Sequence, residues 1–246
     1  MTSLRSDRSG HSDALQIKRF ARIAGAAYAI IIILGAVFAG GLERRLAESN
    51  DLAAAVATIE AHETMIRTAF LAEIAMYALV ILLALSLYVV LRHVDDAMAK
   101  LALLFRGGEA VLGIAFAVLA TALPLQMLQH DVDPHLGELA LSLAGLHAMG
   151  MNVILVLMGL GGTLFFLLFL RSSFTAHFWA IWGLAVYLMM TVVFAIKIVI
   201  PIPETVEMTA YAFGGLFELL FGLRLLIQGV TITTDELDSA PIAAAV

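Results

Sequence analysis

The sequence has no cysteine and few charged residues. Of its 246 residues, 14% are Asp, Glu, Lys or Arg, and none is Cys. The missing thiols exclude disulfides, zinc–thiolate and iron–sulfur sites, and a cysteine nucleophile. The net charge of −6 argues against a nucleic-acid partner, which requires a basic face. Hydrophobic residues make up 62% of the chain, and soluble domains contain roughly 45–50%. The expected surroundings are therefore a lipid bilayer.

Long hydrophobic runs divide the chain. A transmembrane helix needs roughly 20 mostly apolar residues, and six runs satisfy this requirement. We predict an all-α, polytopic membrane protein with a bundle of six transmembrane helices. Residues 1–21 would form a cytoplasmic amino-terminal segment, 22–229 the transmembrane domain and 230–246 a flexible cytoplasmic tail, with residues 1–13 also lacking fixed structure. The predicted spans are Arg22–Leu42, Phe70–Leu91, Leu101–Pro124, His147–Leu170, Phe178–Ile200 and Met208–Gln228.

The loops indicate an orientation. Lys and Arg gather on the cytoplasmic side of membrane proteins, and here they favour the side that holds both termini. That side would carry Arg5, Arg8, Lys18, Arg19, Arg22, Arg92, Lys100 and Arg171, and the opposite side only Arg44, Arg45 and Arg67. The outer loops are acidic, and Glu138 is placed in one of them. In the first outer loop, the sequence from Ser49 to Asp51 is typical of a helix cap, and Leu52, Val56, Ile59 and Ile66 follow at near-helical spacing. We expect a short amphipathic helix there, on the outer surface.

Six ionisable residues lie inside the predicted spans. They are Glu73, Arg106, Glu109, Lys197, Glu218 and Arg224. A charge at the centre of a bilayer costs about 2.5–3.5 kcal/mol on insertion scales, so such residues usually face the bundle interior and pair.

The positions of these charges suggest partners. Arg106 and Glu109 are three residues apart and share a helix face, so they can form a pair. Arg224 could reach the same depth from the last helix. Glu218 lies near the membrane midplane with no partner on its own helix, which suits a proton-linked site.

Two polar residues nearer the outer surface complete the candidate site. Lys197 could pair with Glu73, and Asn152 adds an amide. The candidate ligand-binding cluster is therefore Arg106, Glu109, Glu218, Glu73, Asn152 and Lys197.

The same charges have a structural interpretation. Buried pairs often hold helices in register, and long basic side chains near helix ends can extend to the interface. A solvent-connected cavity around Arg106, Glu109 and Glu218 would favour binding or transport, whereas sealed helix contacts would favour a structural role. Glu109 and Glu218 each precede a glycine by four residues, a faint sign of two halves with opposite topology.

Other site types find little support. The histidines fall mostly in loops, so an intramembrane bis-histidine haem is not expected. The run from His130 to His135, with Glu138, fits no defined metal spacing and is interpreted as a solvated acidic loop. The glycines between Gly159 and Gly162 lie in a hydrophobic helix, where they favour close helix packing over phosphate binding. The spans contain no set of residues typical of a nucleophilic active site, so an enzyme is the weaker hypothesis. We also predict no bound metal or cofactor.

The sequence resembles the bacterial domain of unknown function 4386 family of six-span membrane proteins. The resemblance extends from Ala21 to Gly229, and its most specific segments are Phe105–Ala110, Gly159–Ser172, Glu218 and Leu225–Gly229. The chain departs from the family pattern at Arg224, where a tryptophan is usual, and at Ala176–Ala180. The resemblance implies a multi-pass protein of the bacterial cytoplasmic membrane and no known activity.

The leading functional hypothesis is a small-molecule or lipid binding or transport module, with the bilayer and a small or lipidic ligand as partners. The alternatives are an accessory or assembly protein, whose buried charges hold helices or a partner together, and an intramembrane enzyme that acts on a lipid. The sequence does not indicate an oligomeric state.

Overall fold

The computed structural model describes residues 3–38, 52–128 and 134–231, and within these ranges it is helical with no strand. A π-helical turn, η1 (Val118–Ala122), joins α4 to α5. The helices are α1 (Ser3–Phe38), α3 (Leu52–Leu91), α4 (Asp96–Ala117), α5 (Leu123–Met127), α6 (Pro134–Arg171), α7 (His177–Val199) and α8 (Glu204–Gln228).

Five helical segments within the described ranges are long and apolar enough to cross a membrane, as in an integral membrane protein. They are Ala54–Leu91, Asp96–Met127, Met149–Arg171, His177–Val199 and Glu204–Gln228. Each contains or largely overlaps one of the predicted spans from the second to the sixth. The first predicted span begins in α1 and ends beyond the described residues, so its crossing of the membrane stays a prediction.

Helix boundaries correct two predictions. α1 begins at Ser3, so our expectation of no fixed structure over residues 1–13 was wrong from Ser3 onward, because extending an existing helix is far easier than starting one. α6 begins at Pro134, and Glu138 therefore lies in this helix, not in the outer loop where we placed it. A proline is readily accommodated in the first turn of a helix, where its missing N–H leaves no bond unmade. Most of the predicted flexible tail lies outside the described residues.

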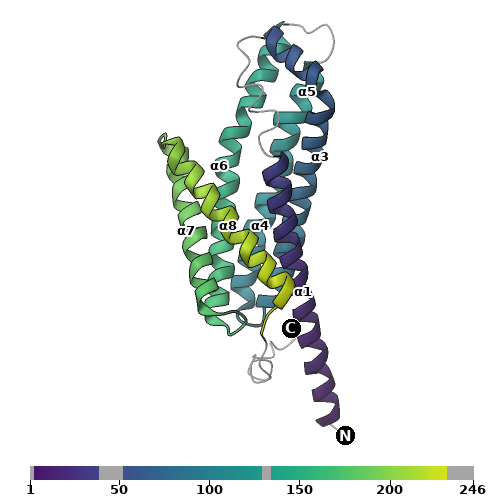
Figure 1. The fold of residues 1–246 in the computed structure, drawn as a ribbon, viewed down its shortest axis with the longest axis vertical. Helices are drawn as coiled ribbons and strands as arrows, with labels where there is room; N and C mark the ends of the chain where they lie inside the picture. Colours follow the sequence, from purple (N-terminus) through teal and green to yellow (C-terminus); the bar gives the residue numbers. More distant parts are fainter. Residues whose placement is uncertain (1–2, 39–51, 129–133, 232–246) are drawn as a thin grey trace.

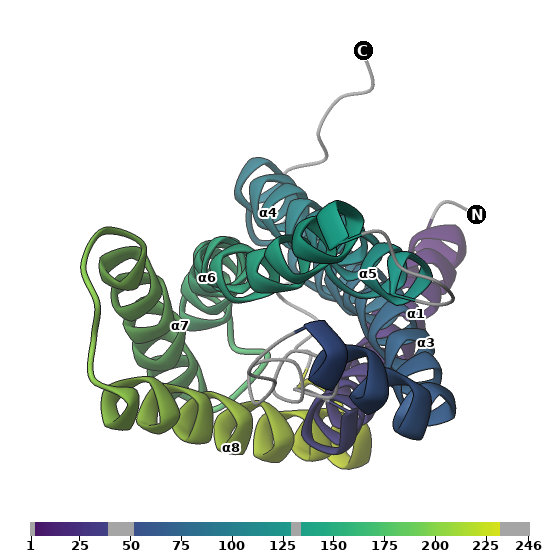
Figure 2. The same cartoon turned by 90° about the horizontal axis from the view of Figure 1, so that it is seen from above.

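The helices follow one another around the bundle in chain order. The helices from α1 to α7 pack on their neighbours along the chain, and α8 packs mainly on α1, which closes the arrangement. Figure 2 shows this order from above, with α8 running obliquely from α7 to α1. α1 begins and α8 ends at the same end of the bundle (Figure 1). The first and last helices are therefore neighbours, and side chains of α1, α4, α7 and α8 can meet in the interior.

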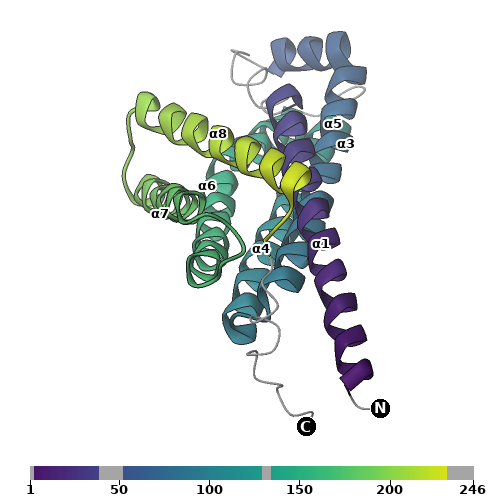
Figure 3. The ribbon, with the colours of Figure 1, turned by 60° about the horizontal axis from the view of Figure 1, so that its bottom comes forward.

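Two local irregularities have identifiable causes. η1 ends two residues before Pro124. The proline nitrogen cannot donate a helical hydrogen bond, and a π-turn is one way in which a helix accommodates the missing bond. In α3, His62 has non-helical angles (φ −128°, ψ 18°). The first turns of α3 lie across the top of the bundle, and the rest of α3 runs down from there (Figure 3). This segment is the region where we predicted an amphipathic helix; its position on a membrane surface stays a prediction.

Polar and apolar side chains are distributed as a bilayer demands. Leu104 and Ile227 are 71% and 72% exposed, whereas Arg106 and Glu109 are each 3% exposed. α4 therefore presents leucine outward and its charges inward, the reverse of a helix on a soluble protein. This reversal places Arg106 and Glu109 inside the bundle, where a site can be built.

Candidate functional site

Arg106 and Glu109 form a buried ion pair on α4. The Nη1 atom of Arg106 lies 2.9 Å from the Oε2 atom of Glu109, and each side chain is 4% exposed. Their spacing of three residues places them on one helix face, and the structure shows the pair that this spacing predicts. Neither of these two atoms has a well-aligned hydrogen-bond partner in the described part of the chain. The pair is therefore held mainly by charge.

Glu218 of α8 accepts a hydrogen bond from a tyrosine. The Tyr187 hydroxyl of α7 lies 2.5 Å from the Oε1 atom of Glu218, and the Tyr28 hydroxyl of α1 lies 3.0 Å from the Tyr187 hydroxyl. A carboxylate oxygen can only accept here, so Tyr187 donates to Glu218 and Tyr28 donates to Tyr187. The result is a chain of hydrogen bonds from α1 through α7 to α8, in which each bond polarises the next.

The ion pair and the tyrosine chain belong to one electrostatic unit. Glu218 interacts with the charges of both Arg106 and Glu109, and Arg106 also interacts with the two tyrosine hydroxyls. We call these five residues, Tyr28, Arg106, Glu109, Tyr187 and Glu218, the polar network. It joins four helices, including the first and the last.

Glycines make the space that the polar network occupies. A Cβ atom built on Gly161 would lie 2.8 Å from Cγ of Arg106, and one on Gly162 would lie 2.2 Å from the ring of Tyr187. Real Cβ atoms essentially never approach so closely, so α6 must carry glycine where these side chains cross it. Gly159 likewise faces the backbone of α7. The prediction that this glycine run serves close helix packing is therefore confirmed.

The glycines that follow the two buried glutamates have a similar role. A Cβ on Gly113, four residues after Glu109, would lie 2.2 Å from the Tyr77 ring. A Cβ on Gly222, four residues after Glu218, would lie 2.6 Å from Cβ of Tyr28. Each glycine thus accommodates a tyrosine from another helix. The relation of the two halves as an internal repeat stays a prediction.

Aromatic rings enclose the tyrosine side of the network. Phe166 stacks on Tyr187 with ring centroids 5.4 Å apart, and it meets Phe217 and Phe221 edge-on at 5.1 and 5.0 Å. Tyr28 and Tyr187 are 2% and 1% exposed, and Glu218 is 8% exposed. The network is therefore sealed within helix contacts, the arrangement that we associated with a structural role.

The other predicted site residues lie elsewhere. Lys197 of α7 forms an ion pair with Glu207 of α8, whereas the sequence had suggested Glu73 as its partner. The short link between α7 and α8 brings these two residues together at one end of the bundle. Glu73 is half-buried on α3, and Asn152 is buried on α6. The structure thus unites Arg106, Glu109 and Glu218 but gives Lys197 a separate partner.

Arg224 does not join the polar network through a hydrogen bond. Its Nη1 atom donates to the backbone carbonyl of Gly229 at 3.3 Å. Gly229 has a φ of +68°, which glycine adopts without strain, and it follows the last residue of α8. Arg224 therefore helps to satisfy the carboxyl end of its own helix.

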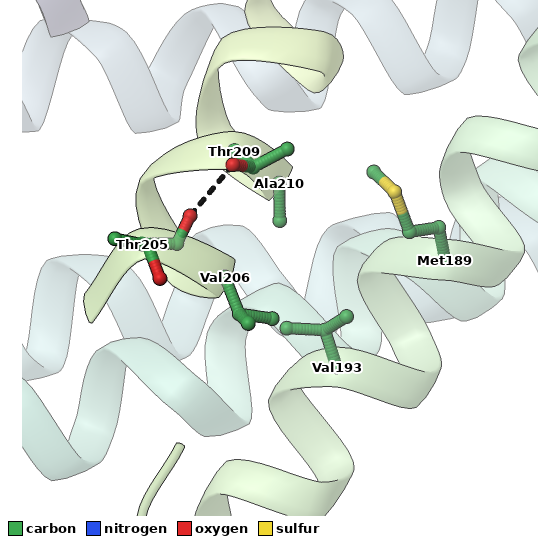
Figure 4. Close-up of a pocket in the computed structure, with 6 residues that line it drawn as sticks. All are labelled: Met189, Val193, Thr205, Val206, Thr209 and Ala210. Atoms are coloured by element: carbon green, nitrogen blue, oxygen red, sulfur yellow. Dashed lines mark hydrogen bonds between the residues drawn. The ribbon is translucent and has the colours of Figure 1, made fainter. Parts of the chain in front are cut away.

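A cleft of about 260 Å³ lies between α7 and α8, apart from the polar network. Its lining is mostly apolar. The Thr209 hydroxyl donates a hydrogen bond to the backbone carbonyl of Thr205 at 2.6 Å (Figure 4). The lining residues are Met189, Val193, Thr205, Val206, Thr209 and Ala210. Such a surface suits an apolar group, so the cleft and the charged network are two distinct features.

Within the described ranges, no three His, Asp or Glu side chains gather in a way that could hold a metal ion. The segment from His130 to Asp133, which we interpreted as a solvated loop, lies outside those ranges.

Sequence reasoning missed the tyrosines. Only charged and amide side chains within the spans were considered, so the neutral tyrosine hydroxyls were left out. The signal was present, because Tyr28 and Tyr187 are phenols inside apolar runs, and a buried tyrosine hydroxyl usually finds a partner.

Comparison with known proteins identifies a family. No curated protein and no solved structure gives a match. Residues 23–229 match the family described as domain of unknown function (DUF4386). Because the match covers most of the 246 residues, the chain belongs to the DUF4386 family.

Proposed function

We propose that the chain is a six-span protein of the bacterial cytoplasmic membrane, with both termini in the cytoplasm, that binds or transports a small or lipidic ligand. In this proposal α1 supplies the sixth span, and the described arrangement is a closed state that the polar network holds together. The observation that carries the proposal is the charge buried in the network. One guanidinium and two carboxyl groups lie between four helices.

Helix association alone does not require such groups. Small residues and neutral hydrogen bonds hold membrane helices together at lower cost, and this chain already has a glycine run between α6 and α7. Ionisable groups at membrane depth usually mark ion or substrate pathways. The charges are therefore better explained by a state-dependent element than by packing alone.

A structural or accessory role is the second candidate, and the sealed packing of the network favours it. The absence of cysteine allows a direct comparison, because a single engineered thiol is then the only one in the protein. Ala110 is fully buried one helical turn from Arg106, and Ser173 is exposed between α6 and α7. Ala110→Cys reports on opening at the network, and Ser173→Cys is the labelling control.

The experiment uses a membrane-impermeant maleimide on protein in phosphatidylethanolamine–phosphatidylglycerol vesicles. If the network opens during function, Ala110→Cys reacts slowly, and adding Tyr187→Phe raises its rate while the protein remains folded. Glu218→Gln should also change the proton flux reported by a pH-sensitive dye inside the vesicles. A structural role predicts no labelling before unfolding, unchanged flux, and a lower folded yield for Glu109→Gln.

A further inference from the structure

We propose that the polar network binds one exchangeable proton, which its two carboxyl groups share and which Glu218 mainly holds. This inference deepens the proposed function, because it names the ion to which ligand binding or transport would be coupled. The number of charges in the sealed site and its hydrogen bonds both support a bound proton.

The count of charges leaves the site one positive charge short. The groups that face Glu218 from the neighbouring helices are Arg106 and Glu109 on α4, Tyr187 on α7 and Tyr28 on α1. Tyrosine is neutral at ordinary pH. With both carboxyl groups ionised, the network would carry a net charge of −1 in a site where Arg106, Glu109 and Glu218 are all buried. An uncompensated charge in such surroundings is so costly that the group takes up a proton instead.

The hydrogen bonds indicate which carboxyl group holds the proton. Glu109 is 2.9 Å from the Arg106 guanidinium, and this contact favours its ionised form. Glu218 receives a neutral hydroxyl from Tyr187 on Oε1, which leaves Oε2 to bind hydrogen. Proton binding forms one O–H bond at Glu218 and turns a carboxylate into a carboxylic acid. Release breaks that bond, and no electrons are transferred.

Infrared spectroscopy tests this directly, because a protonated carboxyl group has its own carbonyl stretch. The full-length protein, with carbon-13 in its glutamate side chains, is measured in lipid films at neutral pH. We expect one band from a buried carboxylic acid, which disappears when the film is brought to high pH. Glu218→Gln should remove the band. Glu109→Gln should remove it as well, because one carboxylate then balances Arg106.

Glu73→Gln is the matched control, because Glu73 is a half-buried glutamate on α3 outside the network, and it should leave the band in place. If a glutamine variant fails to fold, Glu218→Asp replaces it and should move the band out of the carbon-13 glutamate position. Absence of the band from the wild-type protein, or its persistence in either network variant, overturns the proposal. The result is independent of transport: a band in a protein that shows neither thiol labelling before unfolding nor proton flux would refute the proposed function alone.

Discussion

Replacing Gly162 with alanine should break the tyrosine chain without touching any charged residue. The added Cβ would lie 2.2 Å from the ring of Tyr187. That ring is stacked on Phe166 and 1% exposed, so it has little room to withdraw. Its displacement would strain both hydrogen bonds of the Tyr187 hydroxyl.

The size of the effect follows from two contributions. Overpacking a filled interior costs about 1–3 kcal/mol. Two interhelical hydrogen bonds add about 0.6 kcal/mol each, the average measured within a membrane bundle. Together they lower the free energy of unfolding by about 2–4 kcal/mol. Alanine also favours a helix over glycine by about 1 kcal/mol, and a control glycine must remove this gain from the comparison.

Gly107→Ala is that control, because a Cβ at Gly107 would meet nothing within 4 Å. It lies beside Arg106 on α4, so it samples the same depth. We would measure unfolding of both variants in mixed micelles with increasing dodecyl sulfate, followed by the fluorescence of Trp179 and Trp182. Gly162→Ala should be about 2–4 kcal/mol less stable than Gly107→Ala. Equal stabilities would refute the close fit between α6 and the Tyr187 ring.

Three further predictions use the same unfolding measurement. Tyr187→Phe should lower the free energy of unfolding by about 1–3 kcal/mol, because it leaves both Glu218 and the Tyr28 hydroxyl without a partner. Tyr28→Phe should lower it less, and equal losses would contradict the order of the hydrogen bonds. Gly25→Ala places a Cβ 2.3 Å from a backbone nitrogen of α8, which cannot rotate away as a side chain can, so a loss of about 3 kcal/mol or more is expected, and a loss below that of the Gly162 variant would argue against it. Asp95 caps α4 by accepting a hydrogen bond at 3.0 Å, so Asp95→Ala should cost about 1 kcal/mol, and Asp95→Asn should restore most of it.

Much of the helical framework could be predicted from the hydrophobic runs. Which helices pack against each other could not. The predicted span Phe178–Ile200 differs by one residue at each end from α7 (His177–Val199), because polar or turn-forming residues bound the run. The start of α6 at Pro134 was not predicted, because the spans were defined by long apolar runs. A helix can extend beyond the membrane into a sequence of mixed polarity. These helices are apolar on nearly every side, so periodicity does not reveal which faces meet.

The individual pairings in the candidate site were predictable only where both partners share a helix. The Arg106–Glu109 pair followed from spacing alone. The sequence suggested Glu73 as a partner for Lys197, and the structure shows an ion pair with Glu207 on the next helix, which depends on how the α7–α8 link folds. Tyr28 and Tyr187 are 159 residues apart, and no local pattern could connect them.

That separation also bears on how the protein is made. Tyr28 is synthesised with α1, and its partner on α7 is synthesised 159 residues later. At about 5–20 residues per second, the delay is roughly 8–30 s. Throughout this interval α1 displays a phenol and the bare backbone of Gly25 on the face that α8 will cover. The ribosome must therefore deliver α8 before the bundle can close, and until then the face of α1 that α8 covers is without its partner helix.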